Sequence, residues 1–222
     1  MNYDSVPLRD FKELNDWETV IFVYQSALKQ VETKIDILNG EFQHRHKYNP
    51  IEHVKSRIKT PESIVKKLKR HGYESSIENM VRYVNDIAGI RISCSFTSDI
   101  YLIADMISKQ NDLTILARRD YMKNPKKSGY RSYHMLVTTP VFLSDSIIDT
   151  KVEIQIRTVA QDFWATLEHK MHYKFEGDGP DYITKELREC ARYVAELDTR
   201  MEELNNDCLL YTSPSPRDQR GS

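Results

Sequence analysis

The hydrophobic pattern of this chain changes its period in the central part, and that change constrains the fold most strongly. In the flanking segments 17–42 and 187–204, apolar residues recur at steps of three and four, which predicts one long amphipathic helix in each. Between them lie four short segments rich in β-branched residues, which predict strands at 90–96, 113–116, 134–138 and 152–156. This order favours an α+β domain in which a mixed central β-sheet is flanked by helices, with long N- and C-terminal helices.

Shorter helices and two loops complete the predicted domain. Helical spacing recurs at 98–109 and at 160–174, between and after the strands. Residues that favour turns mark loops at 124–129 and 176–180, and the first of these loops lies between two strands. The helices are therefore expected to pack on the sheet, with a turn-rich loop at one of its ends.

Length and composition are those of one soluble globular domain. The 222 residues are 40% hydrophobic and 29% charged, which suffices for a sizeable core. Residues 208–222 turn abruptly into a polar stretch with too little apolar content to pack. We therefore expect a single domain over residues 1–207, followed by a disordered tail or a non-native remnant.

Charge and cysteine content restrict the partners and the compartment. The formal net charge is −1, so the field of the whole molecule gives no reason to expect avid binding to DNA, RNA or an acidic membrane. The chain does not open on a basic start followed by an apolar run, and no run of about 18 apolar residues occurs, so we expect neither export nor a membrane span. Three cysteines without CxxC spacing argue against a disulfide framework or a zinc site, and a reducing, cytoplasmic setting fits best.

Positive charge accumulates around a predicted helix start near residue 60. Thr60 has the properties of an N-cap and Pro61 those of a first helical residue. The free backbone N–H groups of that start, together with Lys59, Ser63 and Lys67, would then converge on an anion such as a polyphosphate. A solvated basic helix face explains the same charges, and both interpretations remain open.

Two carboxylates are candidates for metal binding. Asp86 lies at the mouth of the first predicted strand, close to Arg91, whose guanidinium is suited to stacking on a base or clamping a phosphate. Asp86 can equally be a turn residue. In the last strand Glu153, Gln155 and Arg157 share one face, because side chains alternate along a strand. That face is either exposed to solvent or part of an active site.

Aromatic and imidazole groups gather at two places. In the loop that leads into the third predicted strand, Tyr130 offers a flat surface for a nucleobase, although Tyr130 and Tyr133 are also consistent with half-buried aromatics at a strand start. His169 and His172, with Glu168 beside them, lack the HExxH spacing of a metal pair. A structural role is favoured for this second cluster.

Four segments occur in an order that resembles the synthetase domain of the RelA/SpoT homologue family, and in particular its small stand-alone alarmone synthetases: KSRIKTPESIVKKL, DIAGIR, SGYRSYH and VEIQIRTVAQDFWATLEHK. The resemblance covers roughly residues 16–206. It implies a fold similar to polymerase β-type nucleotidyltransferases and a pyrophosphokinase activity with Mg²⁺. The reaction moves the β,γ-diphosphate of ATP to the 3′-hydroxyl of GDP or GTP and gives AMP with ppGpp or pppGpp. A homotetramer is also implied, whereas the family's hydrolase half is expected to be absent because the chain has no His-Asp dipeptide.

By matching position, the resemblance also assigns residues to the ATP side. It implies that Arg57 and Arg91 sandwich the adenine. The residues implied to hold the ATP phosphates are Lys59, Ser63 and Lys67. Asp86 and Glu153 would take the magnesium ion, and Glu153 would draw the proton from the attacking hydroxyl.

The residues implied for the GDP or GTP side are Lys127, Tyr130, His134, Gln155 and Asp162. Tyr130 would stack on guanine and His134 would contact phosphate. The family often has Asn where this chain has Asp162. An Asp accepts hydrogen bonds from guanine N1 and N2 but cannot donate to O6.

Two other classes of function compete with this interpretation. An RNA-binding or RNA-modifying domain would use the same basic segment and aromatic loop, although a near-neutral chain with one short basic cluster disfavours it. A structural oligomerisation module would use the two heptad-like helices, which are equally suited to packing on the sheet.

Overall fold

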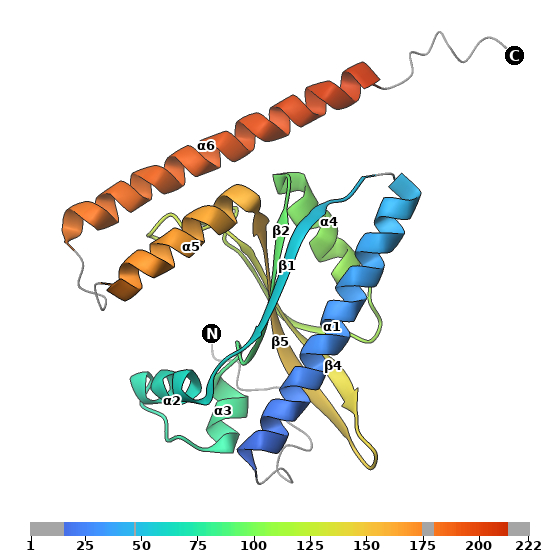
Figure 1. Cartoon of the computed structure of the whole chain (residues 1–222), viewed down its shortest axis with the longest axis vertical. Helices are drawn as coiled ribbons and strands as arrows, with labels where there is room; N and C mark the ends of the chain where they lie inside the picture. The colour runs from blue at the N-terminus through green and yellow to red at the C-terminus, as the bar shows by residue number, and fades with distance from the viewer. Residues whose placement is uncertain (1–15, 47, 175–179, 213–222) are drawn as a thin grey trace, which may run out of the picture.

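The computed structural model describes residues 16–46, 48–174 and 180–212, and within them the predicted α+β fold is confirmed (Figure 1). The helices are α1 (Trp17–His46), α2 (Pro61–Arg70), α3 (Ile77–Tyr83), α4 (Thr97–Ser108), α5 (Val159–Lys174) and α6 (Asp181–Thr212). The strands are β1 (Ile51–Ile58), β2 (Ala88–Cys94), β3 (Thr114–Asp120), β4 (Tyr133–Phe142) and β5 (Ile147–Thr158).

The strands form one mixed sheet in the order β1-β2-β5-β4-β3. Strand β5 pairs parallel with β2 and antiparallel with β4, while β1 and β3 form antiparallel edges. The sequence analysis missed β1. Of its residues only Ile51 is buried, because β1 is an edge strand with mostly exposed side chains, and its charges were read as part of the following basic helix start.

The first long helix packs across the sheet (Figure 1). Its apolar stripe, with Tyr24 and Ile35 at most 2% exposed, joins one core with Ile154 and Ile156 of β5. Even-numbered β5 side chains point into this core. Because side chains alternate along a strand, the odd-numbered ones point to the opposite face of the sheet, where polar groups gather.

The second long helix is held differently. Helix α6 runs beside α5 and buries Ala191 and Asp198, but Leu197, Met201 and Leu204 of the predicted apolar stripe are exposed (Figure 1). The stripe of α6 therefore remains uncovered by the sheet, in contrast to that of α1.

The predicted tail boundary needs a correction. Helix α6 continues to Thr212, so residues 208–212 are helical, whereas 213–222 and most of the predicted loop at 176–180 lie outside the described residues. In the described segments, no helix is both long enough and apolar enough to cross a bilayer.

Candidate active site

The basic helix start has the predicted local structure. Thr60 is the N-cap of α2, its hydroxyl accepts a hydrogen bond from the Ser63 amide at 3.3 Å, and Pro61 is the first helical residue. The Ser63 side chain is exposed at this start and accepts from the Thr60 hydroxyl. This geometry leaves Lys59 just before the helix and Lys67 one turn further on.

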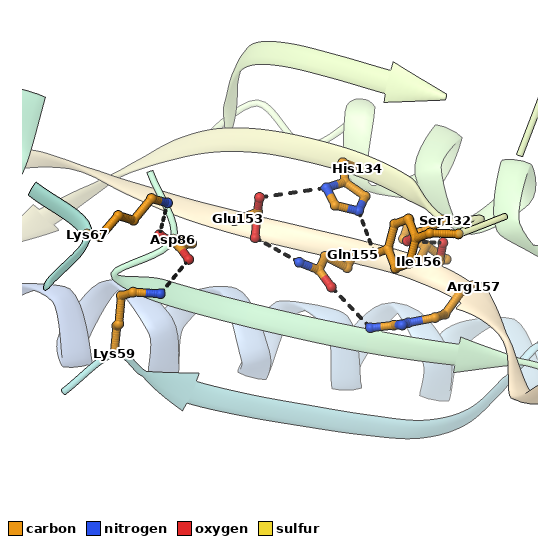
Figure 2. Close-up of polar contacts among 10 residues, drawn as sticks. Lys59, Lys67, Asp86, Ser132, His134, Glu153, Gln155, Ile156 and Arg157 are labelled. Atoms are coloured by element: carbon orange, nitrogen blue, oxygen red, sulfur yellow. Dashed lines mark hydrogen bonds and ion pairs between the residues drawn. The ribbon is translucent and has the colours of Figure 1, made fainter. Parts of the chain in front are cut away.

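Both lysines converge on an anion, and that anion is the carboxylate of Asp86 (Figure 2). Lys59 Nζ donates to Asp86 Oδ2 at 2.8 Å, and Lys67 Nζ donates to Oδ1 at 2.7 Å. Burial raises the pKa of Asp86, but the hydrogen bonds from the two ammonium groups outweigh it and lower the pKa to about 2. Asp86 is therefore an ionised carboxylate held between two cations.

The loop that carries Asp86 is held in place by a buried lysine of β5. Asp86 lies between α3 and β2, at the mouth of the strand predicted at 90–96, which is the second strand in chain order because β1 precedes it. Lys151 of β5 is 5% exposed, and its Nζ donates to Asn85 Oδ1 at 2.8 Å and to the Arg82 carbonyl at 3.2 Å. Burial lowers the pKa of Lys151 to about 8. The sequence analysis missed this residue, although the two-residue period of β5 places it on the face of Glu153.

Parallel pairing of β2 and β5 brings the two predicted carboxylates to one cavity. Gly89 of β2 lies opposite Glu153 of β5, and Asp86 lies two residues before the start of β2. The cavity has a volume of about 230 Å³. Its lining residues are Lys55, Ser56, Arg57, Asp86, Gly89, Ile90, Arg91, Glu153 and Gln155. Asp86 and Glu153 are also close enough for the Asp86 charge to raise the pKa of Glu153.

The two predicted arginines lie on this cavity with a glycine between them. Arg57 of β1 is opposite Gly89 of β2, and Arg91 is the next residue on the same face. A Cβ on Gly89 would meet only Arg57 Cγ, at 4.0 Å. Diagonal neighbours in an antiparallel pair are roughly 7 Å apart, which is about twice the optimal separation between stacked carbon atoms. Gly89 itself adds no side chain to this part of the cavity wall.

On the other side of Glu153 lies a chain of polar contacts (Figure 2). Glu153 Oε2 accepts from Gln155 Nε2 at 2.8 Å, and Glu153 Oε1 is 3.7 Å from His134 Nδ1. His134 Nε2 in turn bonds the Tyr130 hydroxyl at 2.8 Å. The polar face of β5 thus lines the cavity with partly or fully buried side chains, which is not the exposed surface of the other alternative. Burial raises the pKa of Glu153, but His134 and Gln155 outweigh it, so the net pKa is lowered.

In the turn-rich loop, Lys126 lies against two aromatic rings. Lys126 Nζ is 4.6 Å from the ring centroid of Tyr130 and 4.9 Å from that of Tyr121. Lys126 and the next residue, Lys127, are both exposed. Tyr130 packs against the small cluster formed by α5 and α6, while Tyr133 packs on the main core.

That loop is also in direct contact with α6. Gly129 has φ +92°, in the left-handed region that favours glycine, and a Cβ there would lie 2.5 Å from Ala191 Cβ. The position of the Tyr130 ring therefore depends on the docking of the C-terminal helix.

Asp162 lies among three cations instead of standing open to solvent. Its Oδ1 is 3.4 Å from Arg91 Nη1 and 3.4 Å from Arg157 Nε, and its Oδ2 is 3.9 Å from Lys55 Nζ. With its side chain 13% exposed, Asp162 links the arginine of β2 to that of β5. A neutral Asn at this position would provide no such charge.

The donor set fits magnesium. Mg²⁺ prefers carboxylate oxygens and is usually held by one or two carboxylates together with substrate phosphates, which matches the pair Asp86 and Glu153 on one cavity. In the described residues no group of three or more His, Cys, Asp and Glu side chains gathers elsewhere as a metal site. His169 and Glu168 form no such site, and the side chain of His172 lies outside the described residues.

Comparisons with known proteins agree with this geometry. Residues 56–178 match the model of the region found in RelA / SpoT proteins. The chain is 46% identical over 188 residues to GTP pyrophosphokinase YwaC of Bacillus subtilis, an alignment that covers 85% of this chain and 90% of the relative. The crystal structure of small alarmone synthetase 2 from Bacillus subtilis matches with a TM-score of 0.79 and 43% identity, covering 86% of this chain and 99% of that one.

A second solved structure carries a ligand. Small alarmone synthetase 1 from Bacillus subtilis, bound to its product pppGpp, matches with a TM-score of 0.80 and 34% identity over 86% of this chain and 97% of that chain. The fold and the cavity define a nucleotide-handling transferase. The chain belongs to the RelA/SpoT family, with the fold of its small alarmone synthetases.

Proposed function

We propose that this chain is a GTP pyrophosphokinase that transfers the β,γ-diphosphate of ATP to the 3′-hydroxyl of GDP or GTP, giving AMP and ppGpp or pppGpp. One observation carries the proposal. Asp86 and Glu153, far apart in the sequence, line one cavity between a cationic helix start and an aromatic loop. The relatives named GTP pyrophosphokinase and small alarmone synthetase support the same activity.

The β1–β2 side of the cavity is suited to ATP. A flat adenine fits between Arg57 and Arg91 above Gly89, and guanidinium groups stack well on aromatic rings. Lys59, Lys67 and the start of α2 with Ser63 then face the polyphosphate, because ammonium groups and free helix N–H groups both favour anions.

We propose Mg²⁺ as the cofactor, held by Asp86 and Glu153. Bound there with the phosphates, it would neutralise negative charge on the oxygens of the transferred group. Lys59 and Lys67 supply further positive charge on the same side. Phosphoryl-type transfer depends mainly on such charge neutralisation and on alignment of the nucleophile.

The β4–β5 side is suited to the guanosine nucleotide. Tyr130 offers a ring for the guanine, and His134 and Lys126 lie beside it to contact phosphate. The 3′-oxygen of the acceptor attacks the β-phosphorus of ATP, and the bond from that phosphorus to the oxygen of the α-phosphate breaks, which releases AMP. Glu153 accepts the proton of the 3′-hydroxyl, since its lowered pKa keeps it ionised.

The test is product analysis with labelled nucleotides. Incubation with ATP, GDP and magnesium is expected to yield AMP and a new, more highly phosphorylated guanosine nucleotide in equal amounts, and GTP is expected to serve as a second acceptor. The matched control is the isosteric variant Glu153→Gln. If wild-type protein forms no new guanosine product but binds RNA, the RNA-binding alternative replaces the proposal.

We also propose a homotetramer in the cytoplasm. The exposed apolar positions Leu197, Met201 and Leu204 of α6 give copies of the chain a surface on which to associate. The proposed compartment rests on the sequence, whose three cysteines lack the spacing of a disulfide framework or a zinc site. The test is light scattering at micromolar concentration, in which we expect the variant Met201→Glu to be monomeric. A wild-type protein that is also only monomeric would contradict the tetramer.

A further inference from the structure

Five side chains on the β4–β5 side close into a ring of contacts, which we call the contact ring: Tyr130, His134, Glu153, Gln155 and Arg157. Arg157 closes the contact ring because it contacts both Gln155 and Tyr130. Its Nη2 donates to Gln155 Oε1 at 3.1 Å, and its guanidinium carbon lies 5.7 Å from the ring centroid of Tyr130 (Figure 2). The ring thereby joins the carboxylate at the centre of the cavity to the aromatic ring of the loop.

The orientation of the Gln155 amide follows from its two neighbours. An arginine has only donors, and an ionised carboxylate has only acceptors. Gln155 must therefore turn its oxygen to Arg157 and its NH₂ group to Glu153, as the distances of 3.1 Å and 2.8 Å show. If the arginine were absent, Gln155 Oε1 would lose this donor, and within this chain of contacts only the hydrogen bond to Glu153 would orient the amide.

Burial shows that Arg157 acts through its neighbours. It is 1% exposed, although charged side chains are seldom buried without partners. Its charge is compensated by Asp162 at 3.4 Å and by the face of Tyr130. A side chain so enclosed does not reach the cavity, so its effect on a bound nucleotide passes through Gln155 and Tyr130.

We propose that Arg157 is a positioning residue that sets two groups at once: the carboxylate of Glu153, through Gln155, and the ring of Tyr130, by direct contact. This inference rests on the proposed function, because it assigns Glu153 to the chemical step and Tyr130 to guanine binding. Arg157 thereby couples the binding of the acceptor to the orientation of the base that activates its hydroxyl.

Kinetic measurements distinguish the contact of Arg157 with Gln155 from its contact with Tyr130. Arg157→Lys keeps the charge but loses the planar guanidinium that contacts both Gln155 and Tyr130. We therefore expect kcat to fall about 10-fold and the KM for GDP to rise about 10-fold. The KM for ATP is expected to stay within about twofold of the wild-type value. Gln155→Glu keeps an acceptor for Arg157 but has no donor for Glu153. It is expected to lower kcat by a similar factor and to raise the KM for GDP less than Arg157→Lys does, because the contact of Arg157 with Tyr130 is kept.

A double-mutant cycle and a binding measurement complete the test. The kcat loss of Arg157→Lys combined with Gln155→Glu is expected to be no greater than that of either single variant, since both break one path. Calorimetric titration of GDP without ATP is expected to show a larger loss of affinity for Arg157→Lys than for Gln155→Glu. The matched control is Arg192→Lys on the exposed surface of α6.

The outcomes that overturn the inference differ from those that overturn the function. Wild-type protein that makes no guanosine product refutes the function. If wild type is active, additive kcat losses, or an Arg157→Lys effect that is equal for ATP and GDP, refute the role of Arg157. Should Arg157→Lys melt well below the wild type, the Gln155→Glu variant still decides, because an unchanged kcat in that variant contradicts the proposal.

Discussion

The two halves of the cavity are held together by different forces. The half at β1, β2 and α2 is held by ion pairs, in which Lys59 and Lys67 both contact the carboxylate of Asp86. The half at β4 and β5 is a closed set of hydrogen bonds and ring contacts with Arg157 buried behind it. Under the proposed function, we expect the first half to exchange partners when a nucleotide binds, because phosphate oxygens would replace Asp86 as partners of the lysines. The second half is already arranged before any ligand binds.

This difference suits two tasks. A polyphosphate with its metal carries compensating charges of its own, so a site made of ion pairs can open without leaving a buried charge unpaired. A nucleophile, by contrast, must be aligned closely with phosphorus, which favours a rigid surrounding. We therefore expect substitutions in the ATP half to act mainly through charge, and substitutions in the acceptor half to act mainly through geometry.

The largest effect is expected where the halves meet. Glu153→Gln keeps the shape of the side chain and removes both a metal ligand and the proton acceptor, so kcat is expected to fall by about 10³-fold or more. Single-turnover product formation measures this loss, and an unchanged melting temperature shows that the fold is intact. Near-normal turnover would end the assignment of Glu153.

Asp86→Asn distinguishes two roles proposed for Asp86 in the ATP half: binding the metal ion and pairing with the two lysines. We expect turnover to fall by at least about 10²-fold because a metal ligand is lost, while Lys59 and Lys67 are released from their carboxylate. Magnesium-free ATP is therefore expected to bind at least as tightly as to the wild type, as measured by calorimetry in the presence of EDTA. Weaker metal-free binding would show that Asp86 does not compete with phosphate for the lysines.

Tyr130→Ala tests the acceptor half alone. Stacking of a base on an aromatic ring is worth about 1–3 kcal/mol, so the KM for GDP is expected to rise about 10-fold or more. The KM for ATP should stay within about twofold, since Arg57 and Arg91 are on the other half. Tyr130→Phe, which keeps the ring, is the matched control. Equal losses for both substrates would contradict the division of the cavity.

The smallest effect, a change in thermal stability, is expected at a buried carboxylate of α6 that contacts the end of β5 and the start of α5. Asp198 of α6 is 9% exposed and accepts hydrogen bonds from Thr158 and Gln161, both at 2.9 Å. Burial raises the pKa of this carboxyl despite those bonds. As pH falls, the folded state therefore takes up a proton before the unfolded state does, so this group's contribution to the free energy of unfolding rises on acidification.

The variant Asp198→Asn keeps the acceptor oxygen and removes the charge. We expect it to melt about 2 °C above the wild type at pH 7, and the gap to narrow as the pH is lowered through the raised pKa of Asp198. Thermal melts of both proteins across this pH range measure the gap. A gap that widens on acidification would contradict the sign of the shift.

Periodic features of the fold followed from the sequence. The four central strands, the two long helices and the Thr60–Pro61 helix start are local patterns, and all of them are confirmed. Strand β1 was missed because an edge strand with exposed polar side chains has no apolar alternation, and only pairing with β2 makes it a strand.

The partners within the site were less predictable. Alternation along β5 placed Glu153, Gln155 and Arg157 on one face, but it did not reveal that Arg157 is enclosed by Tyr130, which is distant in sequence. In the same way, the anion that Lys59 and Lys67 hold is supplied by a loop beyond two helices. Such contacts depend on tertiary packing, which no local pattern encodes.

The place of β5 in the sheet has a consequence for biosynthesis. This strand lies between β2 and β4, yet it is the last of the five strands to leave the ribosome. Until it inserts, β2 and β4 have no shared neighbour, and Glu153 is not opposite Gly89. Pairing of segments so distant along the chain is slow compared with local folding. We therefore expect that a polypeptide still lacking β5 has no assembled cavity and makes no product.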